Sequence, residues 1–414
     1  MNRPALALTT ALVFCLAPLA HAGDWPEFRG PTGQGLLLTG TLPTTWSKDK
    51  NVVWKQKIPG KGWSSPIVAG GRVYVTTAVP SDNGDQSLRA LCLDAAKGKI
   101  LWQKEIFRQN GKQAPRIHGK NSHASPTPLV RDGKLFVHFG HQGTACLDLD
   151  GKILWRNATL RYAPVHGNGG SPILVDGMLV FSCDGGDKRF IAALNVVDGK
   201  VRWKTPRVVQ AAKKFSFGTP LLIDVGGRKQ IVSPGSNVVC AFDPEDGKEI
   251  WRVRYNGYSV IPRPVYGHGL LFLSTGYDRP SLLAIRADGK GDVTDTHVVW
   301  KMSKAAPHTP SPLLVGDELY TISDNGVASC LNARTGEVHW QERLGGSYSA
   351  SPLFAGGKLY FQSEQGTGVV LQAGKEFKRL AKNPLDEPSL ASAAAADGAL
   401  YLRTETQLYR IGTR

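Results

Sequence analysis

The chain has 414 residues, with 50 lysines and arginines against 34 aspartates and glutamates, so its formal net charge is +16. This charge favours anionic neighbours such as lipid head groups or acidic glycans, or it reflects a solvated basic surface without a specific partner. Nucleic acid is excluded as a partner by the expected export of the chain and by the lack of any recognition-helix or RNP-like pattern. The 47 glycines fit a turn-rich all-β protein.

Residues 1–22 have the three parts of a secretory signal peptide. Arg3 supplies the positive charge, the stretch from Ala5 to Leu19 is apolar, and Ala20 to Ala22 offers small residues at a cleavage site. The apolar stretch is too short for a membrane-spanning helix, and no second run of membrane length follows. We therefore expect no transmembrane segment and a periplasmic or secreted product.

Two sequence marks recur after a leader at residues 23–50. The first is a small or polar residue followed by proline, an apolar run, a glycine turn and a second apolar run. The second is a glycine followed four residues later by tryptophan, which places the glycine in a hairpin turn and the aromatic on the next strand. The first mark begins at Ser65, Thr127, Ser171, Thr219, Arg263, Ser311, Ser351 and, without the proline, Ser392. The second occurs at Gly98/Trp102, Gly151/Trp155, Gly199/Trp203, Gly247/Trp251 and Gly336/Trp340, while Trp300 and Phe377 take the aromatic place in two other copies.

Each copy is predicted to form four short antiparallel strands, A to D, which is the unit of a β-propeller blade. The eighth copy ends one strand short at residues 408–411, and residues 51–58 match the missing outer strand, including its tryptophan, Trp54. Pairing the two segments removes an open sheet edge. We therefore predict an all-β fold, an eight-bladed β-propeller of four-stranded antiparallel blades over residues 51–414, with the ring closed by the N-terminal strand.

Five cysteines follow the signal peptide, an odd number that ordinarily suggests disulfides plus one free thiol. Four of them, Cys92, Cys146, Cys240 and Cys330, lie nine to eleven residues before a tryptophan, and Ala193 takes the same place in another repeat. A position shared by cysteine and alanine is a small buried strand position. We expect packed free thiols rather than disulfides.

These repeats, with glycine-lysine before the strand-D tryptophan and serine-proline opening strand A, resemble PQQ-like repeat propellers over residues 24–413. The leader from Asp24 to Pro31 looks like the start of an exported bacterial subgroup of that family. Quinoprotein alcohol dehydrogenases and an outer-membrane assembly lipoprotein are more distantly similar. The resemblance implies the propeller fold but is nearly silent on activity, because the repeat describes blade packing.

The resemblance also raises pyrroloquinoline quinone (PQQ) with calcium as a cofactor. The dehydrogenases stack the quinone on a tryptophan and cover it with a vicinal cysteine pair, but no two cysteines of this chain are adjacent. The calcium ligands of those enzymes have no clear match either. We therefore assign no cofactor and no metal site, and the site motifs do not support PQQ with calcium.

Chain topology sorts the loops of such a ring into two faces. If strand A runs from top to bottom beside the channel, the B–C turns and the D-to-A connections share the top face, and the A–B and C–D hairpins share the bottom. The bottom hairpins are stereotyped. The top loops are irregular and polar, so we predict the ligand site there, with catalytic residues left unassigned. Its candidate residues are Trp63, Lys120, Asn121, His123, His138, His166, Asn168, Asp184, Asp187, Arg263, Tyr277, Asp278, His308 and Asp324.

Several of these residues have two interpretations. Arg263 stands where the other copies have serine or threonine, hydroxyls that could bond neighbouring backbone groups. Its guanidinium could reach the axis and bind a carboxylate or phosphate, or it could pair with an acid such as Asp278. Trp63 could stack on a planar ligand or cover the end of the core. The histidines and aspartates of blades two and three could bind a metal, transfer protons or be solvated loop residues.

The sequence favours a non-catalytic binding or scaffold module in the cell envelope. Its partner would be an envelope protein, a peptide or an anionic glycan, and we expect a monomer. The alternative is an enzyme, either a divergent PQQ-dependent quinoprotein dehydrogenase or a carbohydrate-active enzyme that uses the top-face channel.

The signal peptide generates the first testable prediction. Export should cleave the chain after Ala22, so intact-mass analysis of exported protein should identify Gly23 as the first residue. A retained leader, or the added mass of a lipid on Cys15, would contradict it.

Overall fold

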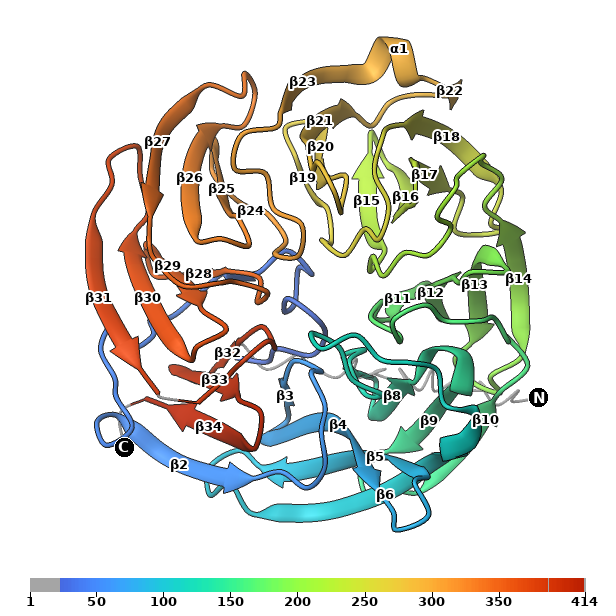
Figure 1. Ribbon diagram of the computed structural model, residues 1–414, viewed down its shortest axis with the longest axis vertical. Helices are drawn as coiled ribbons and strands as arrows, with labels where there is room; N and C mark the ends of the chain where they lie inside the picture. Colours follow the sequence, from blue (N-terminus) through green and yellow to red (C-terminus); the bar gives the residue numbers. More distant parts are fainter. Residues whose placement is uncertain (1–22, 386, 413–414) are drawn as a thin grey trace, which may run out of the picture.

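The computed structural model describes residues 23–385 and 387–412, so the predicted signal peptide lies outside the described residues. Eight antiparallel four-stranded sheets stand around a central axis, and two of them carry a fifth, parallel strand (Figure 1). The described part of the chain contains a single short α-helix, α1 (Thr294–His297), and no helix long and apolar enough to cross a bilayer. The predicted all-β, eight-bladed propeller is confirmed.

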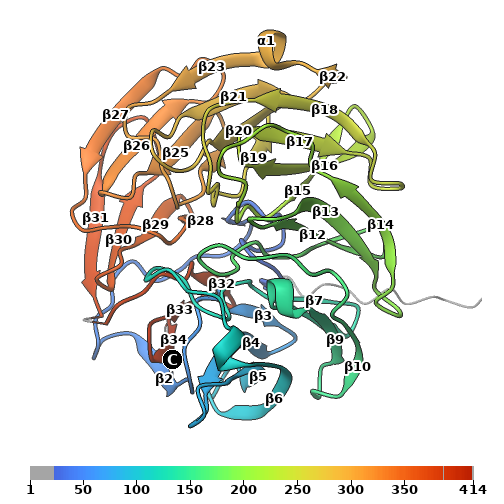
Figure 2. The same cartoon turned by 45° about the vertical axis from the view of Figure 1, so that its right-hand side comes forward.

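The strands of each blade run in order from the axis, where strand A lies, to the outside, where strand D lies; Figure 2 shows the blades obliquely. Blade 1 comprises β3 (Ile67–Ala69), β4 (Arg72–Pro80), β5 (Gln86–Asp94) and β6 (Ile100–Gln109), and blade 2 comprises β7 (Leu129–Arg131), β8 (Lys134–His138), β9 (Thr144–Asp148) and β10 (Ile153–Asn157). Blade 3 comprises β11 (Ile173–Val175), β12 (Met178–Asp184), β13 (Arg189–Asn195) and β14 (Val201–Pro206). Blade 4 comprises β15 (Leu221–Val225), β16 (Arg228–Gly235), β17 (Val238–Phe242) and β18 (Glu249–Arg254), with the added β22 (Gly291–Asp292).

The remaining blades complete the ring. Blade 5 comprises β19 (Val265–Gly267), β20 (Leu270–Ser274), β21 (Leu282–Arg286) and β23 (Val298–Met302), and blade 6 comprises β24 (Leu313–Val315), β25 (Glu318–Ile322), β26 (Val327–Asn332) and β27 (Val338–Arg343). Blade 7 comprises β28 (Leu353–Ala355), β29 (Lys358–Gln362), β30 (Thr367–Gln372) and β31 (Arg379–Pro384), with the added β1 (Leu36–Leu37). Blade 8 comprises β32 (Ala394–Ala396), β33 (Ala399–Arg403), β34 (Gln407–Ile411) and β2 (Val52–Lys57). Two 3₁₀ turns, Gly111–Gln113 and Gly140–Gln142, lie between strands.

The ring closes as the sequence predicts. β2 pairs antiparallel with β34, so the N-terminal strand becomes the outer strand of blade 8, and Trp54 lies opposite Arg410. The Trp54 indole N–H donates to the carbonyl oxygen of Ala95 in blade 1 at 2.9 Å. The first and last parts of the propeller are thereby joined to each other and to the next blade.

The strand-D tryptophans join neighbouring blades. In six of them the indole N–H donates at 2.9–3.0 Å to a carbonyl oxygen at the bottom of the next blade. The same ring packs on a glycine of that blade; a Cβ atom built on Gly98 would lie 2.5 Å from the Trp54 ring. The glycine of the recurrent Gly-x-x-x-Trp mark therefore accommodates the indole of the preceding blade, while the tryptophan reaches the following one.

Each blade also has a buried row of side chains across its strands. In blade 1 the row is Ile67, Tyr74, Cys92 and Trp102, in direct cross-strand register. Cys146 and Cys330 hold the same place opposite their tryptophans. All five described cysteines are free and buried, as predicted.

Two details of the predicted register are wrong. In blade 4 the residue opposite Trp251 is Ala241, and Cys240 lies opposite Arg252 on the other face of the sheet. In blade 7 the place of the strand-D tryptophan is taken by Ala381, opposite Val370, rather than by Phe377. Phe377 precedes β31 and packs against the ring of Trp340 in blade 6, with 5.4 Å between ring centroids.

We predict that Trp54→Ala destabilises the protein by about 3 kcal/mol, the lower end of the range for removing a packed tryptophan, because Trp54 is only partly buried. Urea unfolding followed by circular dichroism would measure it. The matched control is Lys55→Ala on the exposed face of the same strand, which should change stability by less than about 0.5 kcal/mol. Equal, small effects of both substitutions would show that this joint does not hold the ring closed.

The five thiols should be unreactive in the native protein. Burial raises the pKa of Cys92 to about 12 and that of Cys146 to about 11, so the reactive thiolate is scarce at neutral pH. Labelling with a maleimide without reductant, counted by mass spectrometry, should modify no buried thiol in the folded protein and all five in denaturant. Fewer than five labels after unfolding would reveal a disulfide and contradict the prediction.

Candidate functional site

A cavity of about 710 Å³ opens on the top face, above the central axis. Its lining comes from the D-to-A connections, from B–C turns and from the first residues of the inner strands, so nearly every blade contributes to it. The volume is within the range of about 300–1,000 Å³ that is usual for small-molecule sites. We take this cavity as the candidate functional site.

A ring of hydroxyl groups forms the lower part of the cavity. These groups occupy the position before strand A in successive blades, and each accepts a hydrogen bond from the backbone N–H of the corresponding residue in the preceding blade. The bonds are 2.9–3.0 Å long and run from Ser65 to Thr127, Thr127 to Ser171, Ser171 to Thr219, Arg263 to Ser311, Ser311 to Ser351 and Ser351 to Ser392. The expectation that these hydroxyls bond neighbouring backbone groups is confirmed.

The leader closes the channel beneath this ring. It crosses the middle of the propeller (Figure 1), where Trp25 forms a two-bond bridge with Val68 of β3, and β1 pairs in parallel with β28. Between these two attachments, the Phe28 side chain lines the cavity. The cavity floor is therefore supplied by a segment that lies outside all blades.

Arg263 belongs to this floor and not to the cavity lining. Its guanidinium is buried and donates from both terminal nitrogens to Oε1 of Glu27 at 3.2 Å, and to the Phe28 carbonyl at 2.6 Å. The expectation of a free guanidinium at the channel mouth is thus wrong, and its partner is Glu27 rather than Asp278. The leader supplies the acid, so Arg263 fixes the leader in the channel.

Arg29 lies beside this pair and brings a second buried positive charge. It donates to the carbonyl oxygens of Gln34 at 2.7 Å and Pro312 at 2.8 Å, and its Nε and Nη1 atoms have no partner among the described residues. Burial and the nearby Arg263 charge lower the pKa of Arg29 to about 9. Below the cavity there are consequently two guanidinium groups and one carboxylate, Glu27.

Aromatic rings form a continuous arc along the cavity wall. Each ring touches the next, with centroid separations of 5.3–5.9 Å and interplanar angles of 52–84°. Edge-to-face contacts of this kind are favourable and hold the rings in place. In order around the wall, the arc comprises His118, His166, Phe215, Tyr258, Tyr277 and His308.

The charged groups on the wall differ in how far they are neutralised. Lys120 pairs with Glu364 at 2.7 Å. Lys213 instead donates to the Tyr258 hydroxyl at 2.6 Å and stands 4.0 Å above that ring, and it forms no ion pair. Asp324 Oδ2 accepts the backbone N–H groups of His308 and Thr309. Although burial alone would raise the pKa of Asp324, its bonds with His308 and Thr309 hold that pKa below the usual value.

Half of the candidate residues predicted from the sequence lie around this cavity. Trp63, Lys120, Asn121, His166, Tyr277, His308 and Asp324 line it, whereas His123, His138, Asn168, Asp184, Asp187, Arg263 and Asp278 are placed elsewhere. Of the second group, His138 is buried against Phe181 and bonded to Thr144 at 2.8 Å, and burial lowers its pKa to about 3. Asp184 forms a buried ion pair with Arg207 at 3.3 Å.

Other second-group residues serve the loops themselves. Asn168 joins the His141 ring to the Tyr162 hydroxyl, and Asp187 accepts the backbone N–H of Ala163 at 2.7 Å. Asp278 accepts from the Tyr258 hydroxyl at 3.1 Å, behind the aromatic arc.

Sequence reasoning missed several lining residues, chiefly Phe28, Lys213, Phe215, Phe217 and Tyr258. Four of them lie in D-to-A connections, the class of loop that yielded most of the successful candidates, so an equal weight on aromatic residues there would have found Phe215, Phe217 and Tyr258. Phe28 could not have been found in this way, because the path of the leader is set by tertiary contacts.

The residues around the cavity do not fit a quinone held by calcium. Among the described residues, no three His, Cys, Asp or Glu side chains lie close enough together to hold a metal ion. The only carboxylate that lines the cavity, Asp324, is already engaged with two backbone N–H groups. Calcium needs six to eight oxygen ligands, usually with several carboxylates.

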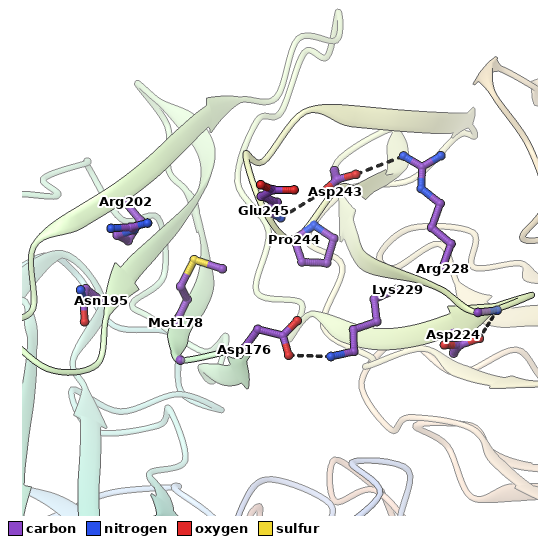
Figure 3. Close-up of a pocket in the computed structure, with 12 residues that line it drawn as sticks. Asp176, Met178, Asn195, Arg202, Asp224, Arg228, Lys229, Asp243, Pro244 and Glu245 are labelled. Carbon is purple, nitrogen blue, oxygen red and sulfur yellow. Dashed lines mark hydrogen bonds and ion pairs between the residues drawn. The ribbon is translucent and has the colours of Figure 1, made fainter.

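A second depression, of about 720 Å³, lies on the bottom face between blades 3 and 4 (Figure 3). Four of its charged side chains form two ion pairs: Lys229 contacts Asp176 at 2.5 Å, and Arg228 contacts Asp243 at 3.1 Å. These side chains are largely exposed, and such surface pairs carry little energy. The top-face cavity is therefore the better candidate.

Comparisons with known proteins agree with this architecture. The family model described as outer membrane protein assembly factor BamB matches residues 31–114, 85–217 and 289–402, which together cover more than half of the chain. BamB from Moraxella catarrhalis has 14% identity and a TM-score of 0.60, covering 88% of this chain and 97% of that one. No curated protein sequence matches the chain significantly.

Two further solved structures are similar to the chain. The computationally designed protein Ika8 has 9% identity and a TM-score of 0.60, covering 87% of this chain and 98% of that one. The quinohemoprotein alcohol dehydrogenase from Comamonas testosteroni has 12% identity and a TM-score of 0.46, covering 94% of this chain and 80% of that one. At identities this low, the two structures with a TM-score of 0.60 demonstrate a shared fold alone. Because the family model spans most of the propeller, the chain belongs to the family of the outer membrane protein assembly factor BamB.

Proposed function

We propose that this protein is an exported, non-catalytic binding module of the cell envelope, and that its ligand binds in the top-face cavity. The observation that carries the proposal is the cavity itself: about 710 Å³ above the axis, closed below by the leader and walled by an arc of six aromatic rings. The description of the family as an outer membrane protein assembly factor supports a place in the envelope. The product would be periplasmic or secreted, as the signal peptide at residues 1–22 predicts.

The bonding of the wall favours binding over proton transfer. Asp324 has its pKa held low by its bonds with His308 and Thr309, so it is an ionised acceptor at neutral pH and not an acid. Burial lowers the pKa of His166, with the nearby His118 and Arg116 charges adding to the effect, so its imidazole is neutral at that pH. These groups present fixed polar atoms to a ligand, which is how small-molecule sites obtain orientation and specificity.

In this proposal the chain has three functional parts. Residues 1–22 direct export, the leader at residues 23–50 floors the site, and the propeller at residues 51–414 provides its walls. The module works as a monomer, because the cavity is complete within one chain.

A cavity-blocking variant tests the proposal. Thr309 lines the cavity and its backbone N–H donates to Asp324, a contact that the substitution can keep, so Thr309→Trp should fill part of the cavity. Wild type and variant would be screened by thermal shift against acidic oligosaccharides, neutral oligosaccharides, short peptides, and PQQ with Ca²⁺. We expect at least one oligosaccharide or peptide class to raise the melting temperature of wild type and not that of Thr309→Trp.

Val197→Trp is the matched control, because it adds the same side chain at an exposed position of a bottom-face turn. It should respond to the ligands as wild type does. A ligand that stabilises Thr309→Trp as strongly as wild type would place the binding site elsewhere. Alcohol-dependent reduction of an electron-acceptor dye by protein loaded with PQQ and Ca²⁺, in which the alcohol is oxidised and the dye reduced, would overturn the non-catalytic assignment.

A further inference from the structure

We propose that the ligand of the top-face cavity is an acidic saccharide of the uronic-acid class, whose carboxylate points down toward the hydroxyl ring while its sugar faces pack on the aromatic arc. This inference rests on the proposed function and adds the chemical class of the ligand. Three independent features of the cavity carry it: the donors of the hydroxyl ring, the charge beneath that ring and the tilt of the aromatic rings on the wall.

The hydroxyl ring offers hydrogen-bond donors to a ligand. A hydroxyl group has one proton and two lone pairs. Each backbone N–H bond between blades occupies one lone pair of the hydroxyl and leaves its proton and the other lone pair. Four buried hydroxyls that line the cavity have no acceptor for that proton among the described residues: Thr127, Ser171, Thr219 and Ser392. A carboxylate, which has two acceptor oxygens, would accept from several of these hydroxyls together.

The charge beneath the hydroxyl ring also favours an anionic ligand. Arg29 and Arg263 are buried below it with a single carboxylate, Glu27, which leaves one positive charge in excess. On the wall, Lys213 forms no ion pair with a described residue. It donates to the Tyr258 hydroxyl, which in turn donates to Asp278, and this hydroxyl bond together with the Asp278 charge raises the pKa of Lys213. The other charged lining residues, Lys120 and Asp324, are already neutralised or engaged. An anionic group on the ligand would therefore compensate the excess charge beneath the hydroxyl ring and could pair directly with Lys213, which Asp278 reaches only through the Tyr258 hydroxyl.

The tilt of the rings distinguishes a sugar from a flat heterocycle. Successive rings of the arc meet at 74°, 84°, 81°, 66° and 52°, so no two neighbours form the parallel slot that would hold a planar molecule on both faces. A pyranose ring in its chair form has apolar C–H patches on more than one side. Its C–H groups carry a small positive charge and are attracted to the negative faces of aromatic rings set at differing angles.

The test uses four probes and four variants. Isothermal titration at physiological ionic strength would compare oligogalacturonate, its methyl ester with the same sugar skeleton and no charge, short oligoglutamate with carboxylates and no sugar, and PQQ. Lys213→Met removes the lysine charge from the cavity wall. Lys214→Met is the matched control, because Lys214 is the exposed neighbouring lysine and does not line the cavity. Phe215→Leu opens the aromatic arc, and Thr309→Trp blocks the cavity.

We expect wild type to bind oligogalacturonate about tenfold more tightly than the methyl ester, and Lys213→Met to reduce that preference to near one. Lys214→Met should bind as wild type, Phe215→Leu should weaken both saccharides, and Thr309→Trp should bind neither. Oligoglutamate should bind weakly and equally to the Lys213 and Lys214 variants, as non-specific association with a basic surface does.

Three results would overturn the inference while leaving the proposed function intact. They are equal affinity for acid and ester, oligoglutamate binding as tight and as dependent on Lys213 as that of the saccharide, and PQQ binding in the cavity in preference to every saccharide. A different result contradicts the proposed function itself: ligands of several classes that bind equally to wild type and Thr309→Trp.

Discussion

The indole that reaches from one blade to the next, at six of the eight junctions, is the contact on which the ring depends. Its N–H bonds a carbonyl of the following blade, and its ring packs so closely against a glycine there that a Cβ atom would not fit. Because the same joint recurs, the angle between blades recurs, and eight blades return the chain to its start. The hydroxyl ring repeats the arrangement at the inner ends of the blades, so each blade is fixed at its rim and at the axis.

The two junctions that lack this joint are covered by added segments. Trp251 of blade 4 bonds Gln230 within its own blade, and here β22 pairs with β18 on the outside. Between blades 7 and 8 the tryptophan is replaced by Ala381, and there the leader contributes Trp46, whose backbone N–H donates to Asn383 of β31. Where a repeat lacks the indole bond to the next blade, a segment from outside the repeats packs at that junction instead.

The fold could be predicted from the sequence because the same pattern of strands, turn glycines and tryptophans recurs in successive repeats. The closing strand was also predictable, since Trp54 marks residues 51–58 as an outer strand without a blade. The register of Cys240 was predicted wrongly because cysteine identity was given more weight than spacing. In blades 1, 3, 4 and 6 the residue opposite the tryptophan lies ten positions before it, whereas Cys240 lies eleven before Trp251. A difference of one residue along a strand moves a side chain to the opposite face.

The site was predictable only in part, for a physical reason. Residues such as His166 and His308 lie in loops whose place is fixed by the blades that they connect, and topology alone assigns them to the top face. Arg263 has a role that depends on Glu27, which reaches it from the leader, far away in the sequence. The path of the leader cannot be predicted from the repeat pattern, because the leader is not part of any repeat. The inner hydroxyls, in turn, owe their position to blade packing, so a structural requirement supplies the polar floor of the cavity, and the irregular loops alone differentiate one such cavity from another.

The path of the leader has a consequence for the order in which the chain can fold. During synthesis the leader and β2 emerge first, yet β1 pairs with β28, and β2 pairs with β34 at the end of the chain. Blades 1 to 6 can pack as they appear, whereas these first segments keep unpaired strand edges until the last blade arrives. Such late, long-range pairing is slow and leaves the nascent chain open to aggregation. The strands that close the ring are thus among the earliest made and the last to be paired.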